Sequence, residues 1–318
     1  MRPIDALLLL MAVIWGTNYS IVKAAFREID PQAFNAVRMS IASAIFLALI
    51  VGIRKLPPRA VEPPADGADA LASIFHTPAA LTRRDWLGLI GLGVVGHFLY
   101  QYFFIGGLAR TSVANSSLML AATPVVIALL APMLGQDRVS RLHWAGAALS
   151  MLGIYIVVGH GASIERAAVI GDVMMFVAVC CWAFYTLGAR QLMMRHSPVG
   201  VTGLSMAIGT LLYVPALWPS VRAVQWSAVS VSTWLAVIYS AVFALCVAYT
   251  IWYAAVRQIG SARTSVYSNL VPLVAMLTAV TFLDEPLTVS KVVGAGAVLI
   301  GVALTRVGRR RVAIPAQE

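Results

Sequence analysis

Four apolar segments of the chain carry polar or aromatic side chains at positions i, i+3 and i+4, a spacing that places them on one face of a helix. Aromatic rings combined with amide, hydroxyl and imidazole groups can bind a small molecule that has an apolar or cationic part and polar ends. The spacing therefore predicts a ligand-binding cavity rather than a catalytic centre. The predicted substrate-binding residues are Trp15, Asn18, Tyr19, His97, Tyr100, Gln101, Trp182, Tyr185, Tyr249 and Tyr253.

Two other interpretations of these side chains remain open. Trp and Tyr at the ends of membrane helices form interfacial belts, a role that fits several Trp and Tyr residues elsewhere in the chain. His97, Tyr100 and Gln101 lie near the middle of their segment, where lipid cannot satisfy a polar group. They favour a shared cavity, and the alternative is a buried contact between helices that holds no ligand.

Two charged or imidazole side chains lie well inside apolar segments, where such groups are functional candidates by default. His97 lies near the centre of its segment. We expect a neutral His97 that hydrogen-bonds to substrate, and the alternative is a structural hydrogen bond to a backbone carbonyl. Arg38 lies less deep, two turns after Pro31. Arg38 either has a structural role, reaching the external interface or pairing with Glu28 or Asp30, or it attracts a substrate carboxylate.

The acidic residues are placed where they cannot serve a buried site. All 13 Asp and Glu residues lie in predicted loops or at segment ends. This weakens any function that needs a carboxylate at the midplane, such as a proton relay or the binding of cationic drugs. The chain has no HExxH motif, no nucleophile elbow and no phosphate-binding glycine loop. We therefore expect no enzymatic activity, no metal and no cofactor. A close-packed membrane helix face is predicted instead from Gly88, Gly91, Gly93 and Gly96.

The composition indicates the elements that must position these residues. Apolar residues make up 60% of the 318 residues and charged residues 11%, and the mean hydropathy is +0.85. These values exclude an ordinary soluble domain. A helix of about 20 apolar residues crosses a bilayer. Segments of that length are predicted at 5–25, 32–53, 85–107, 112–134, 141–159, 171–190, 198–217, 232–255, 262–283 and 288–307.

The second half of the chain repeats the first. Trp15 recurs 167 positions later as Trp182, and from the third segment onward an offset of 148 maps Pro124 onto Pro272. Because each copy has an odd number of crossings, the second copy must be inverted in the bilayer. The sequence predicts an all-α membrane protein of ten transmembrane helices, built as two inverted five-helix repeats over residues 1–160 and 161–318.

Local sequence features predict how the two repeats are connected and where they bend. The two offsets differ because the first repeat carries a polar, Pro-rich loop at residues 56–84, which we expect to be cytoplasmic and flexible. Pro124 and Pro272 are candidate hinges, since proline frees a backbone carbonyl within a helix. Small residues spaced four apart predict close packing of the fifth and tenth helices. Asp137 and Glu285 are expected to complement the starts of these two helices.

The net charge of +10 is explained by topology. Sixteen Lys and Arg residues fall on one side of the predicted membrane and six on the other. The positive-inside rule then places both termini in the cytoplasm. We expect no nucleic-acid partner, and we expect the basic tail Arg309–Arg311 to meet anionic lipid headgroups. The expected setting is a bacterial inner (plasma) membrane, and the expected oligomeric state is a monomer.

Several short motifs carry a family resemblance, through their order and their duplication. They are Trp15-Gly16-Thr17-Asn18-Tyr19, Lys23, Pro31, Phe34, Arg38, Pro124, Gly146 and Gly153, followed by Trp182-Ala183, Arg190, Pro272, Glu285-Pro286, Gly294 and Gly301. On these residues the chain resembles the EamA type of the drug/metabolite transporter superfamily over essentially its whole length. Asp137 departs from the pattern, which usually has Glu there. The resemblance implies ten helices, cytoplasmic termini and the export of small metabolites.

Within that family, the aromatic faces and the lack of buried acids look most similar to bacterial exporters of aromatic and neutral amino acids. We expect a secondary active or facilitative exporter that works by alternating access, with an amino acid as its substrate. The alternatives are an exporter of nucleobases or lipophilic drugs, and a membrane sensor or assembly factor that transports nothing.

Overall fold

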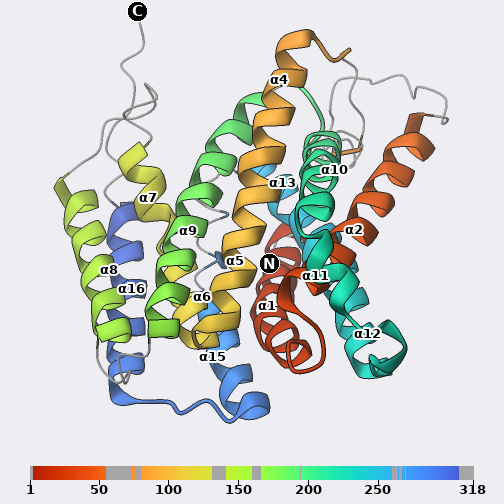
Figure 1. The fold of residues 1–318 in the computed structure, drawn as a ribbon. Helices are drawn as coiled ribbons and strands as arrows, with labels where there is room; N and C mark the ends of the chain where they lie inside the picture. Colours follow the sequence, from red (N-terminus) through yellow and green to blue (C-terminus); the bar gives the residue numbers. More distant parts are fainter. Residues whose placement is uncertain are drawn as a thin grey trace, which may run out of the picture.

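The protein is helical throughout the part of the chain that the structure describes. The computed structural model describes residues 3–54, 74–75, 80–130, 141–159, 166–193, 195–259, 264, 267–268 and 270–307. Within these ranges there is no strand, and the helices run side by side as a bundle (Figure 1). The predicted loop at 56–84 and Asp137 fall largely or wholly outside the described residues.

The helices follow the apolar segments along the chain. In the first half they are α1 (Pro3–Ala25), α2 (Pro31–Arg54), α4 (Arg83–Leu92), η1 (Gly93–Leu99), α5 (Tyr100–Arg110), α6 (Val113–Ala121), α7 (Thr123–Leu130) and α8 (Arg141–Gly159). In the second half they are α9 (Arg166–Met193), α10 (Pro198–Ala216), α11 (Trp218–Ala223), η3 (Trp226–Ala228), α12 (Val231–Tyr239), η4 (Ser240–Val247), α13 (Ala248–Ile259), α15 (Leu270–Leu283) and α16 (Val289–Val307).

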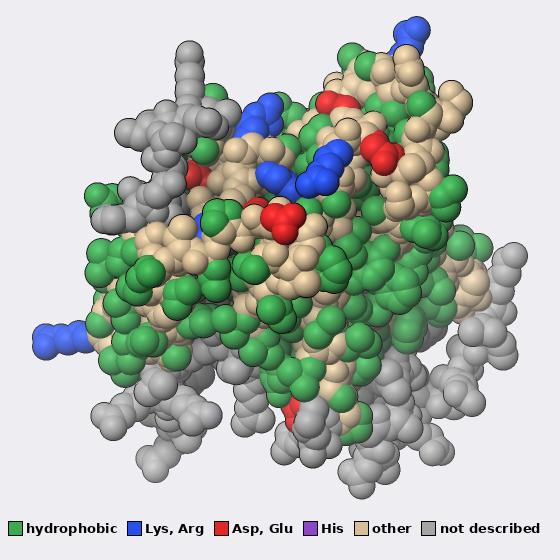
Figure 2. All heavy atoms as spheres, turned by 90° about the horizontal axis from the view of Figure 1, so that it is seen from below, with side chains coloured by type: hydrophobic (Ala, Val, Ile, Leu, Met, Phe, Trp, Pro, Cys, Tyr) green, Lys and Arg blue, Asp and Glu red, His purple; other side chains and the backbone are tan. Residues whose placement is uncertain are grey.

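Six helices among the described residues are long and apolar enough to cross a membrane. They are Pro3–Ala25, Pro31–Ile53, Arg83–Arg110, Ala168–Met193, Pro198–Ala216 and Val231–Val256. They correspond to six of the ten predicted segments, and the other predicted segments correspond to α6 with α7, α8, α15 and α16. Large apolar side chains such as Leu211 and Phe282, each 74% exposed, lie on the outside. Figure 2 shows the bundle from below, toward the ends of the helices, where basic and acidic side chains lie among hydrophobic ones. These features suit a membrane protein, and a total of ten crossings stays a prediction.

The third and eighth predicted segments each contain a π-helical stretch. In the third segment η1 separates α4 from α5, and in the eighth η4 separates α12 from α13. The offset of 148 places the two stretches at matching positions of the repeats. The hydrophobic pattern predicted only plain helices here, because it does not distinguish a wider turn from an ordinary one. Long π-helical stretches are rare and often occur at functional sites.

The fourth predicted segment is interrupted rather than continuous. α6 ends at Ala121, and α7 begins at Thr123 with Pro124 as its second residue. Proline has no backbone N–H to donate, so a helix that contains one lacks a hydrogen bond to the turn that precedes the proline. Pro272 lies at the third position of α15. Both prolines therefore lie at helix starts, and a hinge role remains a prediction.

The fifth and tenth segments pack closely through their small residues, as predicted, and the structure shows that each is the other's neighbour. α8 runs along α16. A Cβ atom added at Gly153 would lie 2.7 Å from the carbonyl oxygen of Gly294, and one added at Gly301 would lie 2.5 Å from that of Gly146. Ser150 donates a hydrogen bond to the Val298 carbonyl at 3.3 Å. The backbones of the two helices can approach this closely only because these positions carry no larger side chain.

Two charged side chains connect helix ends at one end of the bundle. Lys23 of α1 donates to the carbonyls of Leu108 and Thr111, where α5 ends. Glu285 accepts from the backbone N–H of Val113 at 2.7 Å, where α6 begins. Glu285 also lies 3.8 Å from Lys291 in the first turn of α16, the tenth predicted helix, so it contacts the starts of two helices and not only the one that the sequence indicated. A carboxylate is favourable at any helix N-terminus, and tertiary packing brings this one to α6.

Candidate functional site

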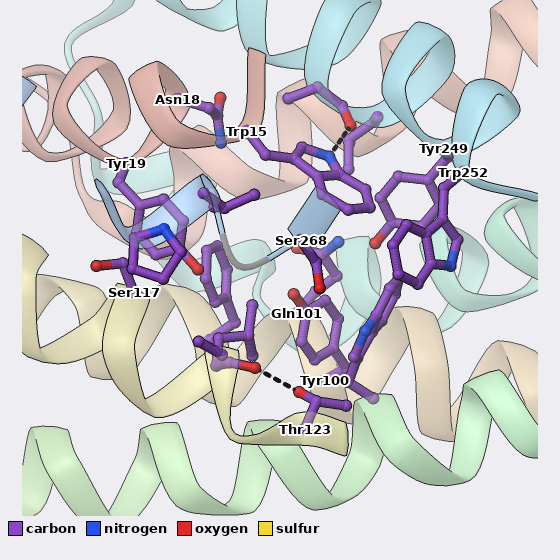
Figure 3. Close-up of a pocket in the computed structure, with 18 of the residues that line it drawn as sticks. Trp15, Asn18, Tyr19, Tyr100, Gln101, Ser117, Thr123, Tyr249, Trp252 and Ser268 are labelled. Atoms are coloured by element: carbon purple, nitrogen blue, oxygen red, sulfur yellow. Dashed lines mark hydrogen bonds between the residues drawn. The ribbon is translucent and has the colours of Figure 1, made fainter. Parts of the chain in front are cut away.

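A cavity of about 100 Å³ lies at the centre of the helices, with walls from both halves of the chain (Figure 3). Seven of the ten predicted substrate-binding residues line it. These are Trp15, Asn18, Tyr19, Tyr100, Gln101, Trp182 and Tyr249. They come from α1, α5, α9 and α13, which are parts of the first, third, sixth and eighth predicted segments. The structure therefore brings together the helix faces that the spacing identified.

Aromatic rings form one wall of the cavity. The Trp15 ring meets Trp182 edge to face with centroids 6.3 Å apart, and it meets Tyr249 in the same way at 5.9 Å. Tyr100 lies against Trp182 at 5.1 Å. The Trp15 indole N–H donates to the carbonyl of Ala244 in η4 at 3.0 Å, which fixes the ring (Figure 3). Such interlocked rings form a rigid surface that can hold an apolar group or a cation.

Three residues that line the cavity each carry a buried polar atom with no hydrogen-bond partner among the described residues. The atoms are Asn18 Oδ1, Tyr19 Oη and Trp252 Nε1, and all three side chains are buried. A buried polar atom without a partner costs about 1–3 kcal/mol. A bound molecule or ordered water that supplied partners would remove that cost. These buried groups are an oxygen acceptor, a hydroxyl group and an N–H donor, and each belongs to a residue that lines the cavity.

Arg38 also lines the cavity, and it is buried, with 1% of its surface exposed. Its guanidinium donates to Asn35 Oδ1 at 2.7 Å, to Ser240 Oγ at 2.7 Å and to Gln101 Oε1 at 2.8 Å. All three acceptors are neutral, and no described carboxylate forms an ion pair with Arg38. A buried cation is costly when no opposite charge accompanies it. Among the described residues, the positive charge of the site is therefore unbalanced.

The structural partners that the sequence suggested for Arg38 are engaged elsewhere. Glu28 accepts from the backbone N–H and the hydroxyl of Ser230, each at 3.0 Å. Asp30 accepts from the backbone N–H groups of Gln32 and Ala33 at the start of α2. The predictions that Arg38 reaches the interface or pairs with either acid are wrong, because its side chain turns inward between α2, α5 and η4.

His97, Tyr185 and Tyr253 are not among the residues that line the cavity. They form a second aromatic layer behind Trp182 and Tyr249. His97 Nε2 lies 3.1 Å from the Tyr185 hydroxyl, and the two rings meet edge to face at 4.9 Å. The Tyr185 ring lies so close to Gly96 that any Cβ there would overlap it. The substrate-contact role predicted for these three residues stays a prediction.

The structure adds residues to the wall that the predicted set does not include. Thr186 and Trp252 share helix faces with predicted residues, so the i, i+3, i+4 spacing does identify them. Phe104 matches Trp252 under the offset of 148 and contacts Tyr19 at 5.5 Å. No such signal marks the residues near the helix interruptions, because their contacts depend on tertiary packing. Those wall residues include Ser117, Thr123 and Ser268.

The described residues contain no group of three or more His, Cys, Asp or Glu side chains that could hold a metal ion. The central site combines aromatic, amide and hydroxyl groups and one guanidinium with aliphatic side chains such as Leu120, Leu245 and Val271. These groups can bind and orient a small molecule.

Comparisons with known proteins identify the family of the chain. A family model described as the EamA-like transporter family matches residues 2–159 and again residues 169–307. An uncharacterised transporter of Bacillus subtilis, YyaM, is 27% identical, with 93% of this chain and 91% of that protein covered. A probable amino-acid metabolite efflux pump of Salmonella typhimurium is 24% identical, with 96% and 95% covered.

A solved crystal structure has the same fold at 18% identity, with a TM-score of 0.65 and with 98% of this chain and 100% of that chain covered. The family model accounts for nearly the whole chain, in two consecutive matches. The names of the family and of the relatives indicate a transporter and not an enzyme. This chain belongs to the EamA-like transporter family.

Proposed function

We propose that the protein exports small metabolites, most favourably amino acids, through the central cavity by alternating access. The observation that carries this proposal is the buried Arg38 guanidinium, which has no described carboxylate partner and faces a cavity lined by aromatic rings. A substrate carboxylate would supply the missing negative charge. The Trp15, Trp182 and Tyr249 rings would contact its ammonium group or apolar side chain.

The unpartnered polar atoms support the same class of substrate. Asn18 Oδ1 can accept a hydrogen bond from an ammonium group, and Trp252 Nε1 can donate one to a carboxylate. An engineered apolar cavity of about 150 Å³ binds benzene. At about 100 Å³, the cavity of this conformation suits a small amino acid, and a larger side chain would require the helices to separate.

We further propose that the two halves are inverted five-helix repeats that rock against each other. The two consecutive family matches support this. So do the matched π-helical stretches, and so does the pattern of helix contacts. α2 packs on η4 as α10 packs on η1, and α1 packs on α13 as α9 packs on α5. Within each of these two pairs, exchanging the equivalent helices of the two halves converts one contact into the other, as a two-fold relation requires.

The proposal is tested by substrate efflux from proteoliposomes loaded with radiolabelled compounds. Neutral amino acids should leave the vesicles faster than from protein-free vesicles. The methyl ester and the decarboxylated amine of the same amino acid should be transported at least about tenfold more slowly, since a hydrogen bond to a charged group contributes about 1.5–3 kcal/mol.

Other outcomes would favour the alternatives. Efflux of nucleobases or lipophilic drugs with no preference for a carboxylate would replace the amino-acid proposal. The absence of flux for every compound in the panel would favour a sensor or assembly factor.

A further inference from the structure

A second hollow lies outside the central site, between α4 and η1 on one side and α9 on the other. This groove has a volume of about 710 Å³ and extends from Arg84 and Arg195 at one end to Tyr185. α4 and α9 belong to two of the helices that can cross a membrane. The groove therefore follows the bilayer from its edge toward the interior.

The groove is open beside one glycine in particular. A Cβ atom added at Gly88 would contact Leu192 at 3.2 Å, and one added at Gly188 would contact Leu92 at 2.9 Å. Beside Gly91, by contrast, no atom lies within 4 Å of the place where a Cβ would sit. Gly91 therefore does not belong to the close-packed face that the glycine pattern predicted.

The corresponding place in the other half of the chain is filled by a side chain. The offset of 148 maps Gly91 onto Tyr239 of α12. The Tyr239 hydroxyl lies 2.8 Å from Thr17 Oγ1 on α1, and the Tyr239 ring stacks on Phe243 at 5.3 Å. A tyrosine thus bridges α12 and α1 where α4 and α9 have open space. Empty space of this kind loses dispersion contacts on its walls, so in a membrane an apolar chain should occupy it.

The rim of the groove is basic. Arg84 is exposed and forms no ion pair with any described residue. The Arg195 side chain is 54% exposed and lies 3.4 Å from Asp85. The Asp85 carboxylate also accepts from Thr82 and lies 3.2 Å from His196. The rim thus has two arginines and one acid, Asp85, which already has partners within the protein. The walls below the rim are apolar and include Leu92, Val95 and Phe184.

We propose that this groove binds an anionic phospholipid. One acyl chain would lie beside Gly91 between α4 and α9, and the phosphate would lie between Arg84 and Arg195. Guanidinium groups bind phosphate through paired charged hydrogen bonds, and basic residues at the membrane surface attract anionic lipid. The proposal is independent of which substrate the central cavity carries.

Native mass spectrometry of the full-length protein in detergent tests the headgroup contacts. Phosphatidylglycerol should bind more tightly than phosphatidylcholine with the same acyl chains. The double variant Arg84→Gln/Arg195→Gln should weaken phosphatidylglycerol binding about thirty-fold, the effect of two basic contacts at a membrane surface. Arg141→Gln/Arg222→Gln removes the same charge at exposed positions elsewhere, and it should leave binding unchanged.

A second variant tests the acyl-chain contact. Gly91→Tyr should fill the groove as Tyr239 does in the other half, and it should displace both lipids. Gly52→Tyr is the matched control, because Gly52 also has no neighbour within 4 Å. Equal binding of the two lipids, or phosphatidylglycerol binding that neither groove variant changes, would overturn the proposal. A Gly91→Tyr protein that keeps its lipid but loses transport would also overturn it, and would make the groove a substrate path. The two arginine substitutions lie on the surface, so this test does not depend on the folding of Gly91→Tyr.

Discussion

At the scale of single residues, the charge balance of the central site decides what it can bind. Arg38 donates only to neutral oxygens, and the acids that the sequence offered as partners serve as caps elsewhere. Its guanidinium has five N–H groups, and its hydrogen bonds to Asn35, Ser240 and Gln101 use three of them. The proposal of a carboxylate-bearing substrate rests on the remaining N–H groups of this buried cation.

Arg38→Gln should remove the preference for a carboxylate. We expect the ratio of efflux rates between an amino acid and its methyl ester to fall about tenfold or more toward one, because the charged hydrogen bond is lost. Arg38→Lys keeps the positive charge but loses the planar guanidinium that can donate two parallel hydrogen bonds, so it should retain part of the preference for a carboxylate. The rate ratio in proteoliposomes measures this. A ratio that stays at the wild-type value in Arg38→Gln would assign Arg38 a purely structural role.

His97 should affect transport through Tyr185 and not through proton coupling. His97→Gln can still hydrogen-bond to the Tyr185 hydroxyl, so we expect efflux to fall by no more than about tenfold, the value of one neutral hydrogen bond. An imposed pH gradient should change efflux little, and equally in both proteins. Acceleration by the gradient that disappears in His97→Gln would instead show that His97 carries a coupled proton.

Glu28 should make the contact between the α1–α2 turn and the start of α12 sensitive to pH. Hydrogen bonds from Ser230 lower the pKa of Glu28 below its usual value. A lowered pKa in the folded state stabilises the fold at pH values above the unfolded pKa, and this contribution is lost as the pH falls through the folded pKa. The melting temperature of Glu28→Gln should therefore differ from that of wild type at neutral pH and converge with it in acid. A constant difference across this range would contradict the prediction.

At the scale of elements, close backbone contact between α8 and α16 joins the ends of the two halves. Gly153→Ala places a Cβ 2.7 Å from the backbone of α16, and the resulting overpacking should cost about 1–3 kcal/mol. Gly296→Ala is the matched control on α16, because no atom lies within 4 Å of its Cβ position. Thermal unfolding in detergent should show a lower melting temperature for Gly153→Ala alone. Equal melting temperatures for the two variants would mean that the helices separate easily.

The interrupted and π-helical elements place functional groups where continuous α-helices would not. η4 presents Ser240 to Arg38 and the Ala244 carbonyl to Trp15. η1 holds His97 against Tyr185. Local widening of a helix changes which side chains face the centre, so the site depends on these stretches as well as on residue spacing.

At the scale of the whole molecule, the distribution of charge predicts the orientation in the membrane. Single cysteines placed in loop 56–84 or in the C-terminal tail should be inaccessible to an impermeant reagent in intact cells. Cysteines near Arg166 or Arg222 should react from outside. The reverse labelling pattern would show that the positive-inside rule fails for this chain.

The sequence by itself determined the helical membrane class, the positions of the long apolar helices and most of one wall of the cavity. These properties depend on hydropathy and on the period of the helix, both of which are local and can be counted along the chain. Seven predicted residues meet in one cavity because each lies on the inward face of its own helix.

The tertiary structure alone decided which partners the side chains find. Arg38 turns inward to Ser240, His97 pairs with Tyr185 behind the cavity, and Glu285 caps α6. Each contact joins residues more than 80 positions apart, so no local pattern specifies it. The same is true of the groove beside Gly91. Whether a glycine lies in a close helix contact or beside open space depends on which side chains of the neighbouring helix lie next to it. Packing decides this, and the local sequence does not.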